Sequence, residues 1–92
     1  MHESSLMKGL LASIEAAARE VSAERVTAVH VTIGALAGIS PDHLAQHFQM
    51  AAVGTLAAGA SLHAVVSDDV CSSDAAHVRL NSIEVLEAET TA

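Results

Sequence analysis

The first three residues of the chain, Met1, His2 and Glu3, combine groups that bind metal ions. A methionine that precedes a residue as large as His is normally retained, so we expect the chain to keep the Met1 amine. This amine, the next two backbone nitrogens and the His2 ring can converge on one ion. Nitrogen ligands in a flat array suit Ni(II) or Cu(II). Because the amine and amides must lose protons to bind, binding should weaken in acid.

Five further histidines are candidate ligands. His43 and His47 stand four residues apart in a predicted helix, so they share a face and form a second pair that could bind a metal. The sequence shows no third ligand for this pair, and a solvated helix face is the simpler interpretation. His30 and His63 fall opposite the main apolar positions of predicted strands, and His77 has no evident partner. We expect these three on the surface.

Cys71 is the only cysteine, so the chain can form no internal disulfide. Asp68, Asp69 and Asp74 lie near it and should disfavour its thiolate, which predicts an unreactive thiol. No set of nucleophile, base and acid, no phosphate-binding loop and no pair of catalytic carboxylates can be recognised. The sequence therefore argues against an enzyme.

The elements that position these residues follow from hydrophobic periodicity and from helix-capping signals. Apolar residues at helical spacing predict a first helix, and Ser40-Pro41-Asp42 provides a cap, a proline and a first-turn acid for a second. Alternating apolar residues predict three strands. The predicted order is helix 5–22, strand 26–33, helix 41–53, strand 62–66 and strand 77–86.

Two details of the strands can be predicted. In the first strand, Thr27 is expected on the same face as Val29, and Val26 on the opposite face. In the last strand the apolar phase shifts between Leu80 and Ile83, so we predict a β-bulge near residues 81–82. We interpret residues 67–76 as a loop that joins an antiparallel pair of strands, and residues 88–92 as a frayed tail.

The chain of 92 residues suits one domain of α+β class, a two-layer sandwich of two helices on a small mixed three-stranded sheet. Apolar residues make up 51% of it, but Phe48 is the only aromatic, so the core must be aliphatic. A net charge of −7 argues against nucleic-acid binding. With no apolar run long enough to span a membrane and no signal-peptide pattern, we expect a cytoplasmic protein without a membrane span.

Three motifs occur in order along the chain: Met-His-Glu-x-Ser-Leu at 1–6, Ile-Gly-Ala-Leu-Ala-Gly-Ile at 33–39 and Gly-Thr-Leu-Ala-x-Gly-Ala-x-Leu at 54–62. Together they resemble the HypA/HybF family of nickel metallochaperones, which help assemble [NiFe]-hydrogenases and, in some bacteria, urease. The resemblance resumes at 78–85. It implies Ni(II) bound by His2 and backbone nitrogens, with Glu3 as ligand or support, so that the predicted metal residues are Met1, His2 and Glu3. It also implies that the protein acts in the cytoplasm together with the GTPase HypB, which shares nickel delivery.

The chain departs from the family pattern in two places. The family normally inserts a zinc domain with two Cys-x-x-Cys pairs between its last two strands, whereas residues 67–76 contain only Cys71. A structural zinc site needs about four ligands. We therefore expect residues 1–92 to form a single nickel-binding domain that binds no zinc in this loop. In addition, Ser40 stands where some members have an acidic residue, and Asp42 follows two positions later.

Two functions remain open at this point. The first is a nickel-binding metallochaperone or accessory protein for [NiFe]-hydrogenase maturation, with the hydrogenase large subunit, a HypB-like GTPase or both as partners. The second is a metal-independent adaptor or scaffold that binds hydrogenase subunits or maturation factors. Self-association by strand exchange is a third, weaker expectation, which would make the chain a homo-oligomer.

Overall fold

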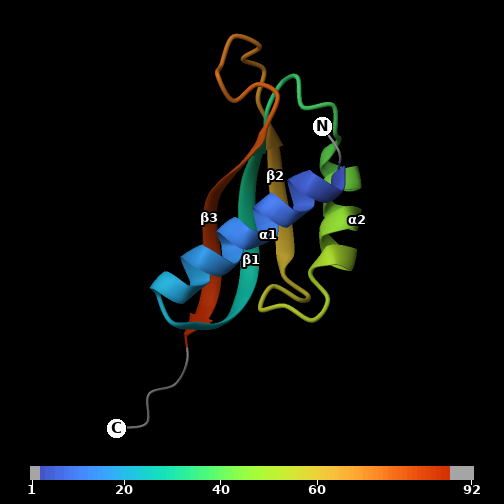
Figure 1. The fold of residues 1–92 in the computed structure, drawn as a ribbon. Helices are drawn as coiled ribbons and strands as arrows, with labels where there is room; N and C mark the ends of the chain where they lie inside the picture. Colours follow the sequence, from blue (N-terminus) through green and yellow to red (C-terminus); the bar gives the residue numbers. More distant parts are fainter. Residues whose placement is uncertain (1–2, 88–92) are drawn as a thin grey trace, which may run out of the picture.

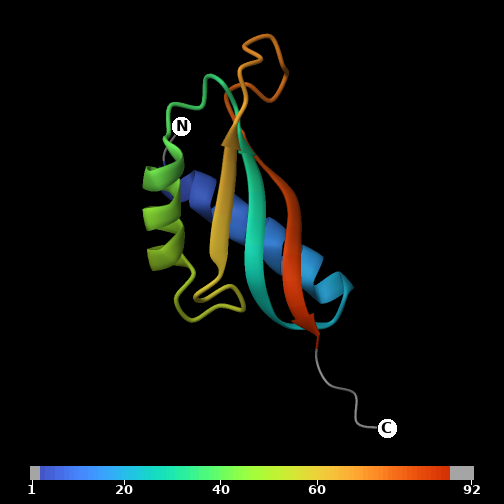
Figure 2. The same cartoon turned by 180° about the vertical axis from the view of Figure 1, so that it is seen from behind.

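The computed structural model describes residues 3–87, with side chains from residue 5 onward, and within this range it has an α+β fold. Its elements in chain order are α1 (Glu3–Glu20), β1 (Ala23–Ile33), α2 (Pro41–Ala51), β2 (Ser61–Val66) and β3 (Val78–Glu87). The helix α1 crosses one face of the sheet diagonally, and α2 runs beside β2 (Figure 1). Seen from behind, the other face of the sheet is not covered by either of these helices (Figure 2). The predicted two-layer sandwich of two helices on a mixed three-stranded sheet is confirmed.

The strand β1 lies in the centre of the sheet, in the order β2-β1-β3. It pairs in parallel with β2 and antiparallel with β3. The parallel pair is joined through α2, because two neighbouring parallel strands need a crossover that returns the chain to the starting edge. The sheet thus places β2 and β3 on opposite sides of the most apolar strand.

The interpretation of residues 67–76 as the link within an antiparallel pair was wrong, because β2 and β3 are separated by β1. The linking loop instead passes over the end of β1. There Ser67 N donates to Ile33 O at 2.9 Å, and Gly34 N donates to His77 O at 2.8 Å. These bonds satisfy backbone groups at the end of β1 and hold both ends of the loop to the central strand.

Both helices follow the sequence pattern with small shifts at their ends. In α1, Leu10, Ile14 and Ala18 face the core as predicted. The helix ends at Glu20, two residues before the predicted end, and Ser22 adopts a positive φ of 54° in the turn that follows. Val21, expected on the buried stripe, is therefore 51% exposed.

The start of α2 confirms the predicted cap. Ser40 has extended backbone angles, and its Oγ accepts a hydrogen bond from His43 N at 3.2 Å. Pro41 follows at the first helical position, where its missing N–H leaves no hydrogen bond unmade. The helix ends at Ala51, two residues before the predicted end. Local sequence thus determines the first turn of α2 more strongly than its last turn, and His43 lies in this first turn.

The strand β3 contains the predicted β-bulge. His30 pairs with Ser82 and Val31 pairs with Leu80, so Asn81 is the extra residue. A second shift, between Val26 and Ala28, makes Thr27 an extra residue of β1. Thr27 is exposed and Val26 is buried, so the prediction of their faces was wrong. The bulge changes the alternation at Thr27 and returns Val26 to the same face as Val29.

The core lies between the helices and the covered face of the sheet. Its buried side chains are Met7, Leu10, Ile14, Ala18, Val26, Val29, Val31, Ile33, Leu44, Phe48, Ala52, Ala57 and Ala60. Phe48 is the only aromatic residue among them, and the others are aliphatic as predicted, apart from Met7. Within the described part of the chain, neither helix is long and apolar enough to cross a membrane.

Candidate metal centre

The predicted N-terminal ligands lie at the limit of the described residues. Met1 and His2 fall outside them, and so does the side chain of Glu3, whose backbone begins α1. The metal site predicted at Met1, His2 and Glu3 therefore stays a prediction. What the structure does define is the element that follows this site.

The beginning of α1 lies beside α2. The two helices are in contact, and both views place the N-terminal end of α1 next to the N-terminal half of α2 (Figures 1 and 2). Leu10 of α1 and Phe48 of α2 belong to the same buried core. The start of the chain is therefore followed by a helix with a fixed position relative to α2.

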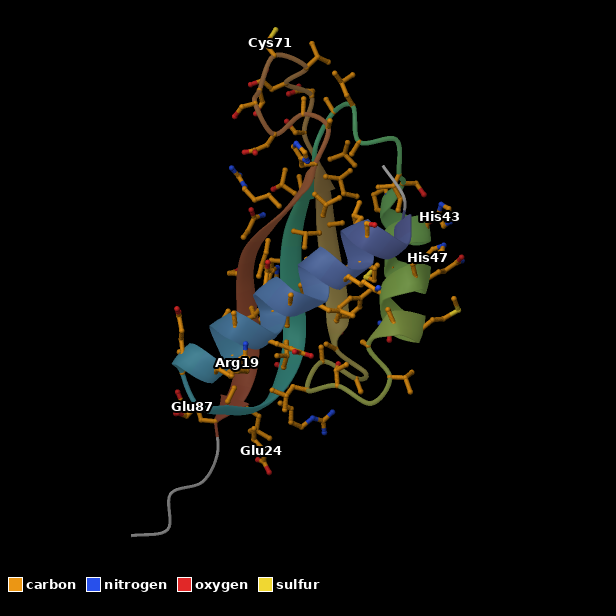
Figure 3. All side chains as sticks on the ribbon, viewed as in Figure 1. Arg19, Glu24, His43, His47, Cys71 and Glu87 are labelled. Atoms are coloured by element: carbon orange, nitrogen blue, oxygen red, sulfur yellow. The ribbon has the colours of Figure 1, made fainter. Side chains whose placement is uncertain are left out.

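The pair predicted on α2 does come together. His43 Nε2 and His47 Nε2 are 2.9 Å apart, and the two rings meet edge to face at an angle of 63°. One imidazole donates to the other in a metal-free pair, because a neutral ring carries one N–H and one acceptor nitrogen. Both side chains project from α2 on the side of the molecule where α1 begins (Figure 3).

A second histidine pair lies on the open face of the sheet. His30 and His63 occupy paired positions on β1 and β2, and their rings stack with centroids 4.9 Å apart. His30 Nε2 also lies 2.7 Å from a carboxylate oxygen of Glu84 on β3. We expected His30 and His63 on the surface, where they are, but the sequence did not reveal their contacts. Only the register of the three strands brings them together.

Cys71 lies at the outer tip of the 67–77 loop, far from His43 and His47 (Figure 3). It is exposed, and its backbone N–H donates to Asp69 Oδ1 at 3.0 Å. Among the residues whose side chains are described, no group of three or more His, Cys, Asp or Glu is arranged to hold a metal ion. Any such group in this protein must therefore draw on residues outside that range or on other ligands.

These motifs and this topology can be compared with known proteins. The family model described as "Hydrogenase/urease nickel incorporation, metallochaperone, hypA" matches residues 1–85. The chain belongs to the HypA family. The matched range includes the three predicted N-terminal ligands and nearly all of β3.

Two curated relatives show how similar the chain is to other HypA proteins. The hydrogenase maturation factor HypA of Chlorobium limicola is 45% identical over 62 residues, which cover 67% of this chain and 53% of that protein. The factor of the same name from Acidithiobacillus ferrooxidans is 42% identical over 65 residues, covering 71% and 58%. This HypA-family chain thus spans about half the length of the curated relatives it matches.

A solved structure has the same fold. The nickel metallochaperone HypA from Helicobacter pylori superposes with a TM-score of 0.78 at 22% sequence identity, covering 96% of this chain and all of that one. At this identity the likeness establishes the fold and carries no residue roles. The HypA fold and the family membership therefore rest on independent comparisons.

Proposed function

We propose that this HypA-family chain binds Ni(II) at Met1, His2 and Glu3 and acts as a metallochaperone or accessory protein in [NiFe]-hydrogenase maturation. The observation that carries the proposal is the family match over residues 1–85, which includes the Met-His-Glu opening. The donor set supports it independently. An amine, backbone nitrogens and one imidazole form the flat nitrogen array that Ni(II) prefers.

The fold is consistent with such a site. Because α1 begins at Glu3 and its side chains Leu10 and Ile14 are buried, the helix behind the donor set is anchored to the core. A ligand set beside an anchored element loses less conformational freedom on binding than one on an unattached segment. The positive end of α1 disfavours a cation, and the carboxylate of Glu3 offsets that charge.

The proposed partners follow from the family. We propose that nickel passes to the large subunit of a [NiFe]-hydrogenase, with a HypB-like GTPase acting in the same delivery. A carrier needs a site that binds its cargo and releases it, and no catalytic group is required for this. We also propose that the 67–77 loop holds no structural zinc, because such a site needs about four ligands and the loop supplies one cysteine, Cys71.

Nickel titration of the chain beginning at Met1 tests the proposed site. The unmodified chain should bind Ni(II) at its terminus, and His2→Ala should weaken this binding by at least about tenfold, since even outer-shell changes at metal sites lower affinity 10- to 100-fold. A peptide tag placed before Met1 should weaken it comparably, because the tag removes the free amine. His77→Ala, which changes an exposed histidine, is the matched control. Equal binding by the unmodified chain and His2→Ala would rule the N-terminal site out.

A further inference from the structure

The ring nitrogens of His43 and His47 converge. Their Nε2 atoms are 2.9 Å apart, whereas the ring centroids are 4.6 Å apart. The nitrogen ends are therefore closer together than the rings as a whole. An i,i+4 spacing on a helix places two side chains one above the other on the same face, which is how helical histidine pairs chelate metals.

The separation of the two nitrogens is close to that of two ligands of one metal ion. Two imidazole nitrogens that each lie about 2.05 Å from a metal are about 2.9 Å apart when they subtend 90°, and about 3.3 Å apart at a tetrahedral angle. The 2.9 Å between His43 Nε2 and His47 Nε2 is the length of a hydrogen bond, and it lies within a small rotamer change of both values. Imidazole nitrogens bind Ni(II) and Cu(II), whose tetragonal sites place adjacent ligands at 90°.

The pair on the open face of the sheet has a different geometry. The rings of His30 and His63 are nearly parallel, with an interplanar angle of 14°. Since the lone pair of an imidazole nitrogen lies in the plane of its ring, the lone pairs of two stacked rings do not meet at one point. His30 Nε2 is also engaged by Glu84 at 2.7 Å. His63 therefore provides a control with the same side chain and without convergent geometry.

The surroundings of the α2 pair allow a cation to enter. His43 is exposed and His47 half-buried, and Asp42 adds a carboxylate in the same first turn. The helix start disfavours positive charge there, and the Asp42 carboxylate and the net charge of −7 act in the opposite direction. For both Nε2 atoms to bind one metal ion, the ring that donates the shared proton would change to its Nδ1–H tautomer, so that each Nε2 offers a lone pair. Water or additional ligands would fill the other positions of the ion.

We propose that His43 and His47 form a second metal site, which binds Ni(II) or Cu(II) through both Nε2 atoms. This site uses none of the three residues of the proposed N-terminal site. It lies on α2 on the side of the molecule where α1 begins, so the chain would offer two nickel sites on neighbouring elements (Figure 3). Two histidines provide only part of the coordination sphere of such an ion, which suits an ion that is to be passed on.

Titration with NiCl2 in a His2→Ala background tests this site apart from the N-terminal one. The His2→Ala chain should still bind one equivalent of Ni(II), measured by isothermal titration calorimetry. Adding His43→Ala or His47→Ala should weaken that binding by at least about tenfold, since either change removes a ligand. Adding His63→Ala should change it by less than about twofold. Absence of nickel binding in His2→Ala, or equal effects of His47→Ala and His63→Ala, would overturn the proposal.

Paramagnetic NMR gives a second measurement that leaves the pair intact, so it does not depend on the folding of the variants. Substoichiometric Cu(II) added to the His2→Ala chain should broaden the imidazole signals of His43 and His47 together, before those of His30, His63 and His77. Broadening of the His30 or His63 signals at lower Cu(II) concentration would refute a site on α2. Failure of the N-terminal proposal would appear separately, as equal nickel binding by the unmodified chain and His2→Ala.

Discussion

The two faces of the sheet differ in how their side chains are held. On the covered face, apolar residues such as Val29 and Val31 are at most 1% exposed and pack against the helices. On the open face, polar residues contact one another across strands, as His30 does with Glu84 and Asn81 does with Thr32. Burial therefore determines the fold on one face, while the register of the strands arranges the polar groups on the other.

The largest effect on stability is expected from a change at Phe48, which is fully buried on the covered side of the sheet. Phe48→Ala should lower the free energy of unfolding by about 3–5 kcal/mol, because it removes transfer energy and leaves a cavity. That is a large share of the roughly 5–15 kcal/mol by which domains are stable. Urea denaturation monitored by circular dichroism measures the change.

The matched control for Phe48 is Met50 on the same helix, which is 71% exposed. Met50→Ala should change the free energy of unfolding by no more than about 0.5 kcal/mol. Similar denaturation midpoints for the Phe48 and Met50 variants would show that α2 does not contribute to the core as described.

A smaller effect on stability is expected at Gly34, which follows the end of β1 and lies against the 67–77 loop. A Cβ at Gly34 would lie 2.3 Å from Ala75 O and 2.4 Å from Asp74 O. Gly34→Ala must therefore push the loop backbone away, and we expect a loss of about 1–3 kcal/mol, typical of overpacking. Thermal unfolding should show a lower Tm.

Gly9 in α1 is the control for Gly34, because a Cβ there would meet nothing within 4 Å. Gly9→Ala should raise the free energy of unfolding by about 0.5–1 kcal/mol, since alanine favours a helix interior over glycine. The two glycine-to-alanine changes should thus shift the Tm in opposite directions. Shifts of the same sign would contradict the close approach at Gly34.

The elements could be predicted from the sequence where local signals are strong. Ser40 and Pro41 define the start of α2 because capping depends on neighbours in the chain. The bulge at Asn81 could be predicted because Leu80 and Ile83 break the alternation visibly. The bulge at Thr27 could not, because Val26 and Ala28 on either side are both apolar and fit either phase. Where both phases of alternation fit the sequence, only the packing of the folded chain determines which residue forms the bulge.

The strand order and the open-face contacts depend on residues far apart in the chain. The sequence places His30 and His63 in strands, but it does not say that β1 separates β2 from β3 or which residues pair. The pair on α2 is different, since helical spacing alone predicted that His43 and His47 share a face. Its 2.9 Å nitrogen separation is a matter of side-chain rotamers, which spacing does not determine.

The smallest effect on stability is expected on the open face, from the contact between His30 and Glu84. Their side chains are 37% and 64% exposed, so solvent screens the pair. A double-mutant cycle of His30→Ala and Glu84→Ala should give a coupling energy of about 0.2–1 kcal/mol, which should fall as salt is added. The cycle is measured by urea denaturation at low and high ionic strength. A coupling above about 2 kcal/mol that resists salt would mean that the pair is desolvated, as in an interface. In that case the open face would be covered in solution by a partner or a second copy, and sedimentation velocity would distinguish the two.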